Sequence, residues 1–296
     1  MSFIGQTNKS NENAGLYLLT ICIVMLSLIV GQEIVNGIAN SVLGFSLADI
    51  PKSADLNTVL SLLLIPFAFV FASLLLCVKH IHKRPILSAF TTRASFDWKR
   101  FFTSFTIWGV VLLLSLVIGI LSGAPVDWNF NPSTFLVLTL ISVFLIPIQT
   151  SAEELLFRGY LLQGFGRLFK RAWMAILLSG ILFGLLHWAN PEVALIGDVL
   201  LIYYVSTGVF LGLLTVFDDG MELAMGYHAI NNIFASMILT NDWQAFHTDA
   251  LLIDRSGPVF GWESWLTIIL LQPLLLFAYA KIYKWKNLKE KLFTKI

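Results

Sequence analysis

Charged side chains are scarce in this sequence. Of its 296 residues only 12% are charged, while 57% are hydrophobic and the mean hydropathy is +0.80. An ordinary soluble domain is about one quarter charged, and 19 basic plus 18 acidic residues are too few to cover a water-exposed surface of this size. The composition therefore predicts a membrane protein whose apolar surface is covered by lipid.

Two further absences exclude other classes. The net charge is only +1, and no basic stripe is interleaved with aromatic residues, so nucleic acid is not expected as a partner. Cys22 and Cys77 are the only cysteines, and they lie in apolar runs without CxxC spacing. Neither a disulfide framework nor a thiolate zinc site is indicated.

Long apolar runs are what the sequence does contain. A bilayer core needs about 20 apolar residues per helix, and eight stretches qualify: about 16 to 38, 58 to 78, 101 to 122, 134 to 162, 172 to 189, 193 to 217, 221 to 240 and 264 to 283. We predict an all-α, polytopic membrane protein with eight transmembrane helices. The first run is interpreted as an uncleaved anchor and not as a signal peptide.

Basic residues gather on one side of this arrangement. All lysines and arginines except Lys52 and Arg255 fall in the N-terminal tail, the loop after the second run, the turn after the fourth or the C-terminal end. Because cytoplasmic loops retain Lys and Arg, both termini are predicted to be cytoplasmic, in a multi-pass protein of the cell membrane. His80 and His82 of the basic loop would then be solvated.

Ionisable side chains inside apolar helices are costly, and the usual reason for them is function. The fourth run contains Glu153, Glu154 and Arg158. At i, i+4 the Glu154 and Arg158 side chains share a face, so the guanidinium can neutralise that carboxylate. Glu153 points about 100° away and is left for another partner. A helix end surfacing among lipid headgroups is the alternative explanation of these charges.

Two histidines lie in other apolar runs. Gly180, Gly184 and His187 form one helical stripe, and small residues at that spacing let a second helix approach closely. His228 and Asn232 stand at i, i+4 and aim two hydrogen-bonding groups at one point, a geometry that suits an oxyanion or a metal-bound water.

The depths of these groups can be compared along the chain. Glu153 and His187 lie at similar distances, roughly 25 Å at about 1.5 Å per residue, from the turn near Phe169 and Lys170. The hairpin is therefore expected to place Glu153 and His187 at the same depth in the membrane. His228 follows the acidic turn at 218–219 by fewer residues, so its helix must begin deeper or tilt to join them.

Three motifs carry a resemblance to a known family. EELLFR at 153–158 resembles an EExxxR motif, FGLLH at 183–187 an FxxxH motif and HAINN at 228–232 an HxxxN motif. Together they are similar to the signatures of the CPBP intramembrane peptidases, which include type II CAAX prenyl endopeptidases and Abi-type bacteriocin-immunity proteins. The resemblance covers residues 134–240 as a catalytic core, between an N-terminal three-helix region at 1–133 and an outer loop, last helix and basic tail at 241–296.

The resemblance implies hydrolysis of a peptide bond within the membrane, in a membrane-associated or lipidated protein or peptide. Carried over by position, Glu153 and His187 would activate a water. His228 and Asn232 would then hold the tetrahedral oxyanion.

Cofactor dependence stays open at this stage. Glu154 and Arg158 would support the site whichever chemistry applies. A metal-dependent enzyme would bind a divalent ion such as zinc through Glu153, His187 and His228, whereas a glutamate-driven peptidase would need none.

Other functions are also considered. A non-catalytic membrane partner or immunity protein of the same fold stays open, and so does a proton-coupled transporter, although no repeat symmetry favours one. No HExxH motif is present. Near-matches to serine-rhomboid and GxGD aspartyl motifs lack a glycine, because Ile120, Leu177 and Leu195 stand in its place.

Overall fold

Helices account for most of the chain. The computed structural model describes residues 2–9, 13–47, 49–51 and 53–295. Its α-helices are α1 (Ala14–Ile38), α2 (Leu56–Leu76), α3 (Trp98–Leu121), α4 (Pro132–Glu154), α5 (Leu162–Phe169), α6 (Ala172–Leu186), α7 (Pro191–Ile196), α8 (Leu200–Asp218), α9 (Glu222–Met237), α10 (Trp262–Leu266), α11 (Gln272–Ile282) and α12 (Leu288–Phe293).

Tighter and wider helical turns extend or join these helices. The 3₁₀ turns are η1 (Ile4–Lys9), η4 (Ile86–Ala89) and η6 (His187–Ala189). The π-helical turns are η2 (Ala39–Leu43), η3 (Cys77–Ile81), η5 (Leu155–Leu161) and η7 (Thr267–Leu271). Because η5 follows α4 and leads into α5 without a break, residues 132–169 form one long rod.

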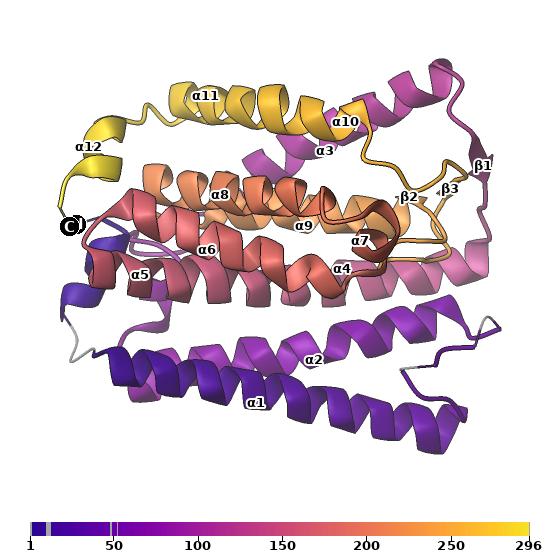
Figure 1. Ribbon diagram of the computed structural model, residues 1–296, viewed down its shortest axis with the longest axis horizontal. Helices are drawn as coiled ribbons and strands as arrows, with labels where there is room; N and C mark the ends of the chain where they lie inside the picture. Colours follow the sequence, from indigo (N-terminus) through magenta and orange to yellow (C-terminus); the bar gives the residue numbers. More distant parts are fainter. Residues whose placement is uncertain (1, 10–12, 48, 52, 296) are drawn as a thin grey trace.

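The long helices lie alongside one another as a bundle, with the chain reversing at its two ends (Figure 1). α1 and α2 form one side of the bundle, α3 and α11 the opposite side, and the remaining long helices lie between them. α9 packs against α3, α4 and α8, so this helix is central. η1 and α12 lie at the same end of the bundle (Figure 1).

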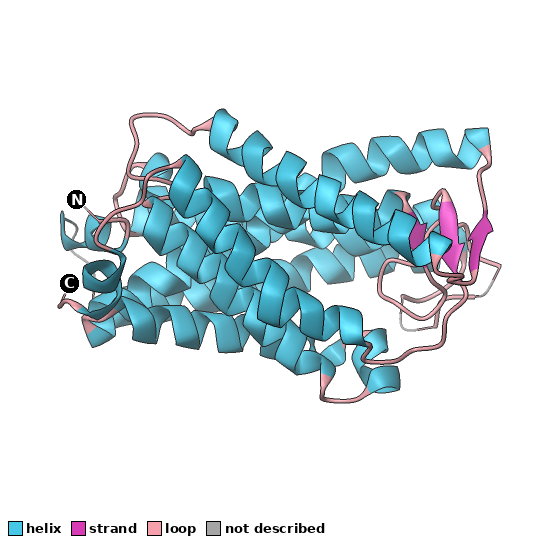
Figure 2. Cartoon of the chain, turned by 90° about the horizontal axis from the view of Figure 1, so that it is seen from above, coloured by secondary structure: helices cyan, strands magenta, loops and turns pink. Residues whose placement is uncertain are grey.

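Three short strands close the other end (Figure 2). β3 (Leu252–Asp254) pairs antiparallel with β1 (Val126–Trp128) and parallel with β2 (Leu239–Thr240). The small sheet, which the apolar pattern did not predict, connects the end of α9 to the segment between α3 and α4.

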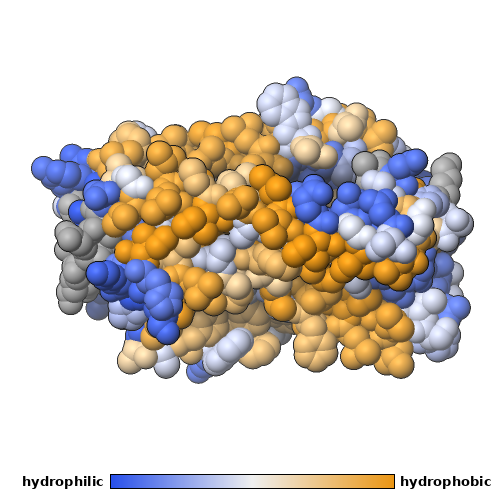
Figure 3. Space-filling model, turned by 90° about the horizontal axis from the view of Figure 1, so that it is seen from below, coloured by the Kyte–Doolittle hydropathy of each residue, from blue (hydrophilic) through white to orange (hydrophobic). Residues whose placement is uncertain are grey.

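The outside of the bundle is apolar. Seven helices in the described part of the chain are long and apolar enough to cross a membrane. Leucine and isoleucine side chains point outward from them, with Leu18 66% and Ile269 69% exposed, and apolar residues dominate the middle of the face in Figure 3 while hydrophilic ones gather toward its ends. Lipid can cover such a surface, so the prediction of a multi-pass membrane protein is confirmed.

Exposed tryptophans mark both ends of the bundle. Trp98 and Trp173 begin α3 and α6 at the end that carries η1, while Trp128 and Trp262 lie at the end that carries the sheet. Tryptophan is enriched where the bilayer meets water. These positions indicate that the long axis of the bundle crosses the membrane.

The predicted count of eight full-length spans is not confirmed. The seventh predicted span, 221 to 240, is α9, which has 16 residues and is about 24 Å long at about 1.5 Å per residue. Its residues from Glu222 to Ala229 are all buried, so protein and not lipid surrounds its first half. α9 still returns the chain along the bundle, and cytoplasmic termini stay a prediction.

The sixth predicted run, 193 to 217, is interrupted. α7 ends at Ile196, and Gly197 has a φ of 95°, a left-handed conformation that glycine adopts without strain. α8 then begins at Leu200. Hydrophobicity alone does not reveal such a break.

Two basic-loop assignments were wrong. His82 is only 2% exposed, and its Nε2 lies 3.1 Å from Thr20 Oγ1 and 2.8 Å from Tyr160 Oη. Arg158 was counted with the turn after the fourth run, yet it is fully buried inside the long rod. Both side chains are therefore part of the protein interior.

The small-residue stripe of α6 is confirmed as a close helix contact. A Cβ on Gly184 would lie 2.8 Å from the backbone nitrogen of Val205 in α8, and one on Gly180 would lie 2.8 Å from that of Val209. Backbone atoms cannot move aside as a flexible side chain can. The glycines thus set the distance between α6 and α8, and with it the position of His187.

We expect Gly184→Ala to destabilise the protein by about 1–3 kcal/mol, because overpacking forces the two helices apart. Apparent melting temperature in detergent, followed by tryptophan fluorescence, measures the effect. Gly37→Ala in α1 is the matched control, since nothing lies within 4 Å of its added Cβ. Equal melting temperatures for both variants would show that the α6–α8 distance is not fixed by glycine.

Buried carboxylates at the turn between α8 and α9 are held by one arginine from the segment before α3 and one from the first turn of α3. Arg93 contacts Asp218 Oδ2 at 2.9 Å and Glu222 Oε2 at 3.1 Å, and Arg100 Nε lies 2.9 Å from the same Asp218 oxygen. The side chains of Asp218 and Glu222 are 1% and 0% exposed. This cluster anchors the start of α9 inside the protein.

Arg93→Ala should lower the free energy of unfolding by about 3 kcal/mol, because removing one partner leaves buried charge uncompensated. Arg255→Ala is the control, since its pair with Asp127 is 50% and 60% exposed and such surface pairs contribute about 0–1 kcal/mol. Denaturation in detergent compares the two. A loss for Arg93→Ala no larger than that for Arg255→Ala would contradict the anchoring role.

Candidate active site

A fully buried ion pair lies where α4 passes into η5. Arg158 Nη1 is 2.8 Å from Glu154 Oε1, and both side chains are 0% exposed. Arg158 Nη2 donates to the Gly208 carbonyl of α8 at 3.1 Å, and the guanidinium carbon lies 4.4 Å from the centre of the Phe183 ring of α6. The predicted Glu154–Arg158 pairing is confirmed, and Arg158 joins three helices.

His228 of α9 lies between the two adjacent carboxylates. Its Nδ1 is 2.8 Å from Glu154 Oε1, so Nδ1–H donates to that carboxylate. Its Nε2 faces the other way and lies 3.5 Å from Glu153 Oε2. Sequence reasoning assigned Glu154 to Arg158 alone and missed this second partner.

Glu153 is oriented by an amide that sequence reasoning also missed. Gln149, one helical turn earlier in α4, donates from Nε2 to Glu153 Oε1 at 2.6 Å. Its Oε1 accepts from Asn232 Nδ2 at 3.0 Å, and the same Asn232 nitrogen is 3.5 Å from His228 Nε2. A buried glutamine four residues before Glu153 in an apolar run was the available signal.

The second carboxylate oxygen of Glu153, Oε2, is buried beside His228. Glu153 Oε2 is buried and accepts no hydrogen bond from any described residue. Buried carboxylate oxygens are normally hydrogen-bonded, and an exception needs a functional or structural reason. His228 Nε2 lies 3.5 Å from it.

His187 lies at the end of α6 on the other side of Phe183. Its Nδ1–H donates to the Phe183 carbonyl at 2.8 Å, which leaves Nε2 of the neutral ring as an acceptor. The His187 ring stacks on Tyr204 at 4.2 Å, and the Phe183 ring lies 4.6 Å from His187 and 5.9 Å from His228. Phe183 thus separates the two histidines and contacts both.

The predicted site residues are brought to one region from three helices. Glu153 and His228 interact directly, and His187 is connected to His228 through the Phe183 ring, although it forms no hydrogen bond to Glu153 within the described part of the chain. His228 reaches the site because α9 starts inside the protein, as the fully buried Met221 and Glu222 show.

A polar cluster covers the His187 side of this region. Tyr204, which stacks on His187, donates its hydroxyl to Glu192 Oε1 at 2.6 Å, and Glu192 Oε2 accepts from the Ala245 backbone N–H at 3.0 Å. Glu192 therefore ties the segment after α9 to α7. Sequence reasoning missed this carboxylate, which falls in the short gap between the fifth and sixth predicted runs.

The candidate metal ligands do not form a metal site in this arrangement. A catalytic zinc takes three protein ligands. His187 forms no hydrogen bond to Glu153 or His228 in the described part of the chain, and no group of three His, Cys, Asp or Glu in the described ranges converges as an ion requires. The chemistry below is accordingly derived from the side chains alone.

The chain is similar to known proteins over much of its length. Residues 132–234 match the family model of the type II CAAX prenyl endopeptidase Rce1-like proteins, a range that contains all the residues of the cluster. A relative from Bacillus subtilis (strain 168), the uncharacterized protein YyaK, is 34% identical over 231 residues, which are 76% of this chain and 75% of the relative. No solved structure matches.

The matched range contains Glu153, Glu154 and Arg158 in α4 and η5, His187 at the end of α6, and the part of α9 that carries His228. The similarity therefore falls on the part of the bundle where these buried polar groups meet. This multi-pass membrane protein belongs to the type II CAAX prenyl endopeptidase Rce1-like family of intramembrane proteases.

Proposed function

We propose that this protein is an intramembrane endopeptidase in which Glu153 is the general base and acid. The observation that carries the proposal is the buried Glu153 Oε2, which accepts no hydrogen bond from a described residue and faces His228 Nε2 at 3.5 Å. Gln149 fixes the other oxygen at 2.6 Å, so the carboxylate is held in one orientation.

The proposed mechanism uses a doubly protonated His228. Glu153 and Glu154 carry two negative charges, and Arg158 supplies one positive charge. A doubly protonated His228 makes the group neutral overall, which favours burial of all four side chains. In that state Nδ1–H donates to Glu154, and Nε2–H points toward Glu153 and Asn232.

The proposed hydrolysis uses these groups in order. Glu153 takes a proton from a water, with His187 Nε2 accepting the second water hydrogen in a hydrogen bond. The water oxygen bonds to the peptide carbonyl carbon, and the resulting oxyanion is stabilised by His228 Nε2–H and Asn232 Nδ2–H. Glu153 then gives its proton to the leaving amine as the C–N bond breaks.

The substrate class follows from where the site lies. Glu153 is part of a rod that spans residues 132–169, and His187 is at the end of another membrane-crossing helix. A scissile bond must therefore enter the helix bundle from a membrane-associated segment. We propose a protein or peptide with an apolar or lipidated C-terminal region.

Glu153→Gln should lower kcat by at least about 100-fold, because the amide cannot accept the proton and general acid–base catalysis contributes about 10²–10⁴. The assay follows cleavage of a quenched fluorescent peptide, with and without a prenylated C-terminal cysteine, by protein reconstituted in liposomes. Glu263→Gln, an exposed carboxylate at the start of α10, is the matched control. Wild-type cleavage by Glu153→Gln would contradict the mechanism, and a cellular phenotype unchanged by it would favour a non-catalytic partner protein.

Arg158→Lys should reduce stability and activity together, despite keeping the positive charge. A single ammonium cannot reproduce the two arms that reach Glu154 Oε1 and the Gly208 carbonyl. Breaking a buried pair costs about 3–5 kcal/mol, and we expect a loss near the lower end. Lys291→Arg near the C-terminus serves as a charge-conserving control, and a melting temperature for Arg158→Lys equal to wild type would contradict the bridging role.

A further inference from the structure

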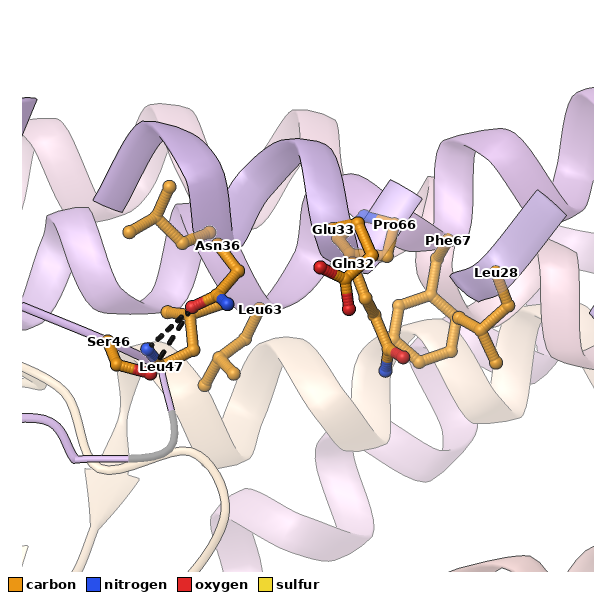
Figure 4. A pocket seen from close by; sticks show the side chains of 10 residues that line it. Leu28, Gln32, Glu33, Asn36, Ser46, Leu47, Leu63, Pro66 and Phe67 are labelled. Carbon is orange, nitrogen blue, oxygen red and sulfur yellow. Dashed lines mark hydrogen bonds between the residues drawn. The ribbon is translucent and has the colours of Figure 1, made fainter. Parts of the chain in front are cut away.

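A pocket lies between α1 and α2 (Figure 4). These two helices form one side of the bundle (Figure 1). Its volume is about 430 Å³, and it lies outside the family-matched residues 132–234. Figure 4 shows Gln32 and Glu33 side by side, with Leu28 and Phe67 to one side of them and Asn36 to the other. Polar and apolar groups therefore occupy one cavity.

Glu33 is an unusual residue in a membrane-crossing helix. The span runs from Ala14 to Leu43, and Glu33 stands five residues before the end of α1 at Ile38, which is about 8 Å along the axis. Glu33 has no ion pair or hydrogen bond with any residue that the structure describes. An ionised carboxylate at this depth needs a partner.

The other polar groups of the pocket are uncharged. Asn36 Oδ1 already accepts from the Leu47 N–H at 3.1 Å and from Ser46 Oγ at 3.4 Å, which holds this turn against α1 (Figure 4). Pro66 lies inside α2 and has no N–H to donate to the carbonyl of Leu62. Among the described lining residues there is no lysine, arginine or histidine.

The apolar part of the pocket leads to the lipid-facing surface. Leu28, Leu63 and Phe67 line it, and Leu63 is 39% exposed. Gln32 and Glu33 are also exposed, so the cavity opens sideways from the two helices. A molecule bound there would place a polar group on Glu33 and an apolar chain on the leucines.

We propose that this pocket binds a phosphatidylethanolamine molecule, with its primary ammonium on the Glu33 carboxylate and an acyl chain along Leu28, Leu63 and Phe67. The ammonium supplies the positive charge that the lining lacks, and its N–H groups can donate to the Glu33 carboxylate in charge-assisted hydrogen bonds. Phosphatidylglycerol has no cation, and the quaternary ammonium of phosphatidylcholine has no N–H. A lipid also reaches a laterally open cavity directly from the bilayer.

Native mass spectrometry of the purified full chain tests this site, with phosphatidylethanolamine, phosphatidylcholine and phosphatidylglycerol of identical acyl chains titrated separately. We expect phosphatidylethanolamine to bind most tightly, and Glu33→Gln to weaken it about tenfold, or about 1.4 kcal/mol, because the amide offers the ammonium no negative charge. Glu263→Gln, exposed at the sheet end but outside the pocket, should bind all three lipids as wild type does.

Two results would overturn the proposal: equal affinity for the three lipids, or unchanged phosphatidylethanolamine binding by a folded Glu33→Gln. If Glu33→Gln does not fold, Leu63→Trp gives a second test, because the larger ring fills the apolar side of the pocket. Leu63→Trp should then lose the preference for phosphatidylethanolamine, and its retention would count against the site.

Discussion

The buried guanidinium of Arg158 is the group on which the arrangement of this site depends. Its arms reach Glu154 and the Gly208 carbonyl, and its face rests on Phe183. Glu154 in turn accepts from His228, so four helices converge on one positive charge. Such a pair adds little net stability relative to an apolar core, but breaking it is strongly destabilising, which makes the geometry hard to change.

This constraint separates two carboxylates that are neighbours in the chain. Glu154 Oε1 accepts hydrogen bonds from both Arg158 and His228. Glu153 points about 100° away, and its Oε1 accepts a hydrogen bond from Gln149. The remaining Glu153 oxygen is the reactive position in the proposed mechanism. His228 contacts both carboxylates and so connects the buried Glu154–Arg158 ion pair to Glu153, the proposed catalytic residue.

Much of this could be predicted from local spacing. The i, i+4 relation of Glu154 and Arg158, the glycine stripe before His187 and the hairpin that levels Glu153 with His187 all depend on helical geometry within or between adjacent runs. Such features are encoded within a few turns of helix.

Contacts between distant helices could not be predicted in this way. Gln149 is neutral and therefore did not stand out among apolar residues, and the second partner of Glu154 comes from a helix 74 positions later. The burial of His82 depends on Thr20 and Tyr160, which no local pattern joins to it. The short α9 was taken for a full span because hydropathy does not distinguish lipid from surrounding protein.

The division of roles between the paired carboxylates is tested most directly by the free energies of unfolding of Glu153→Gln and Glu154→Gln, measured side by side in the same detergent. The account predicts that Glu154→Gln loses about 3 kcal/mol, because Arg158 is left buried without its counter-ion, while Glu153→Gln stays close to wild type. A larger loss for Glu153→Gln than for Glu154→Gln would contradict it.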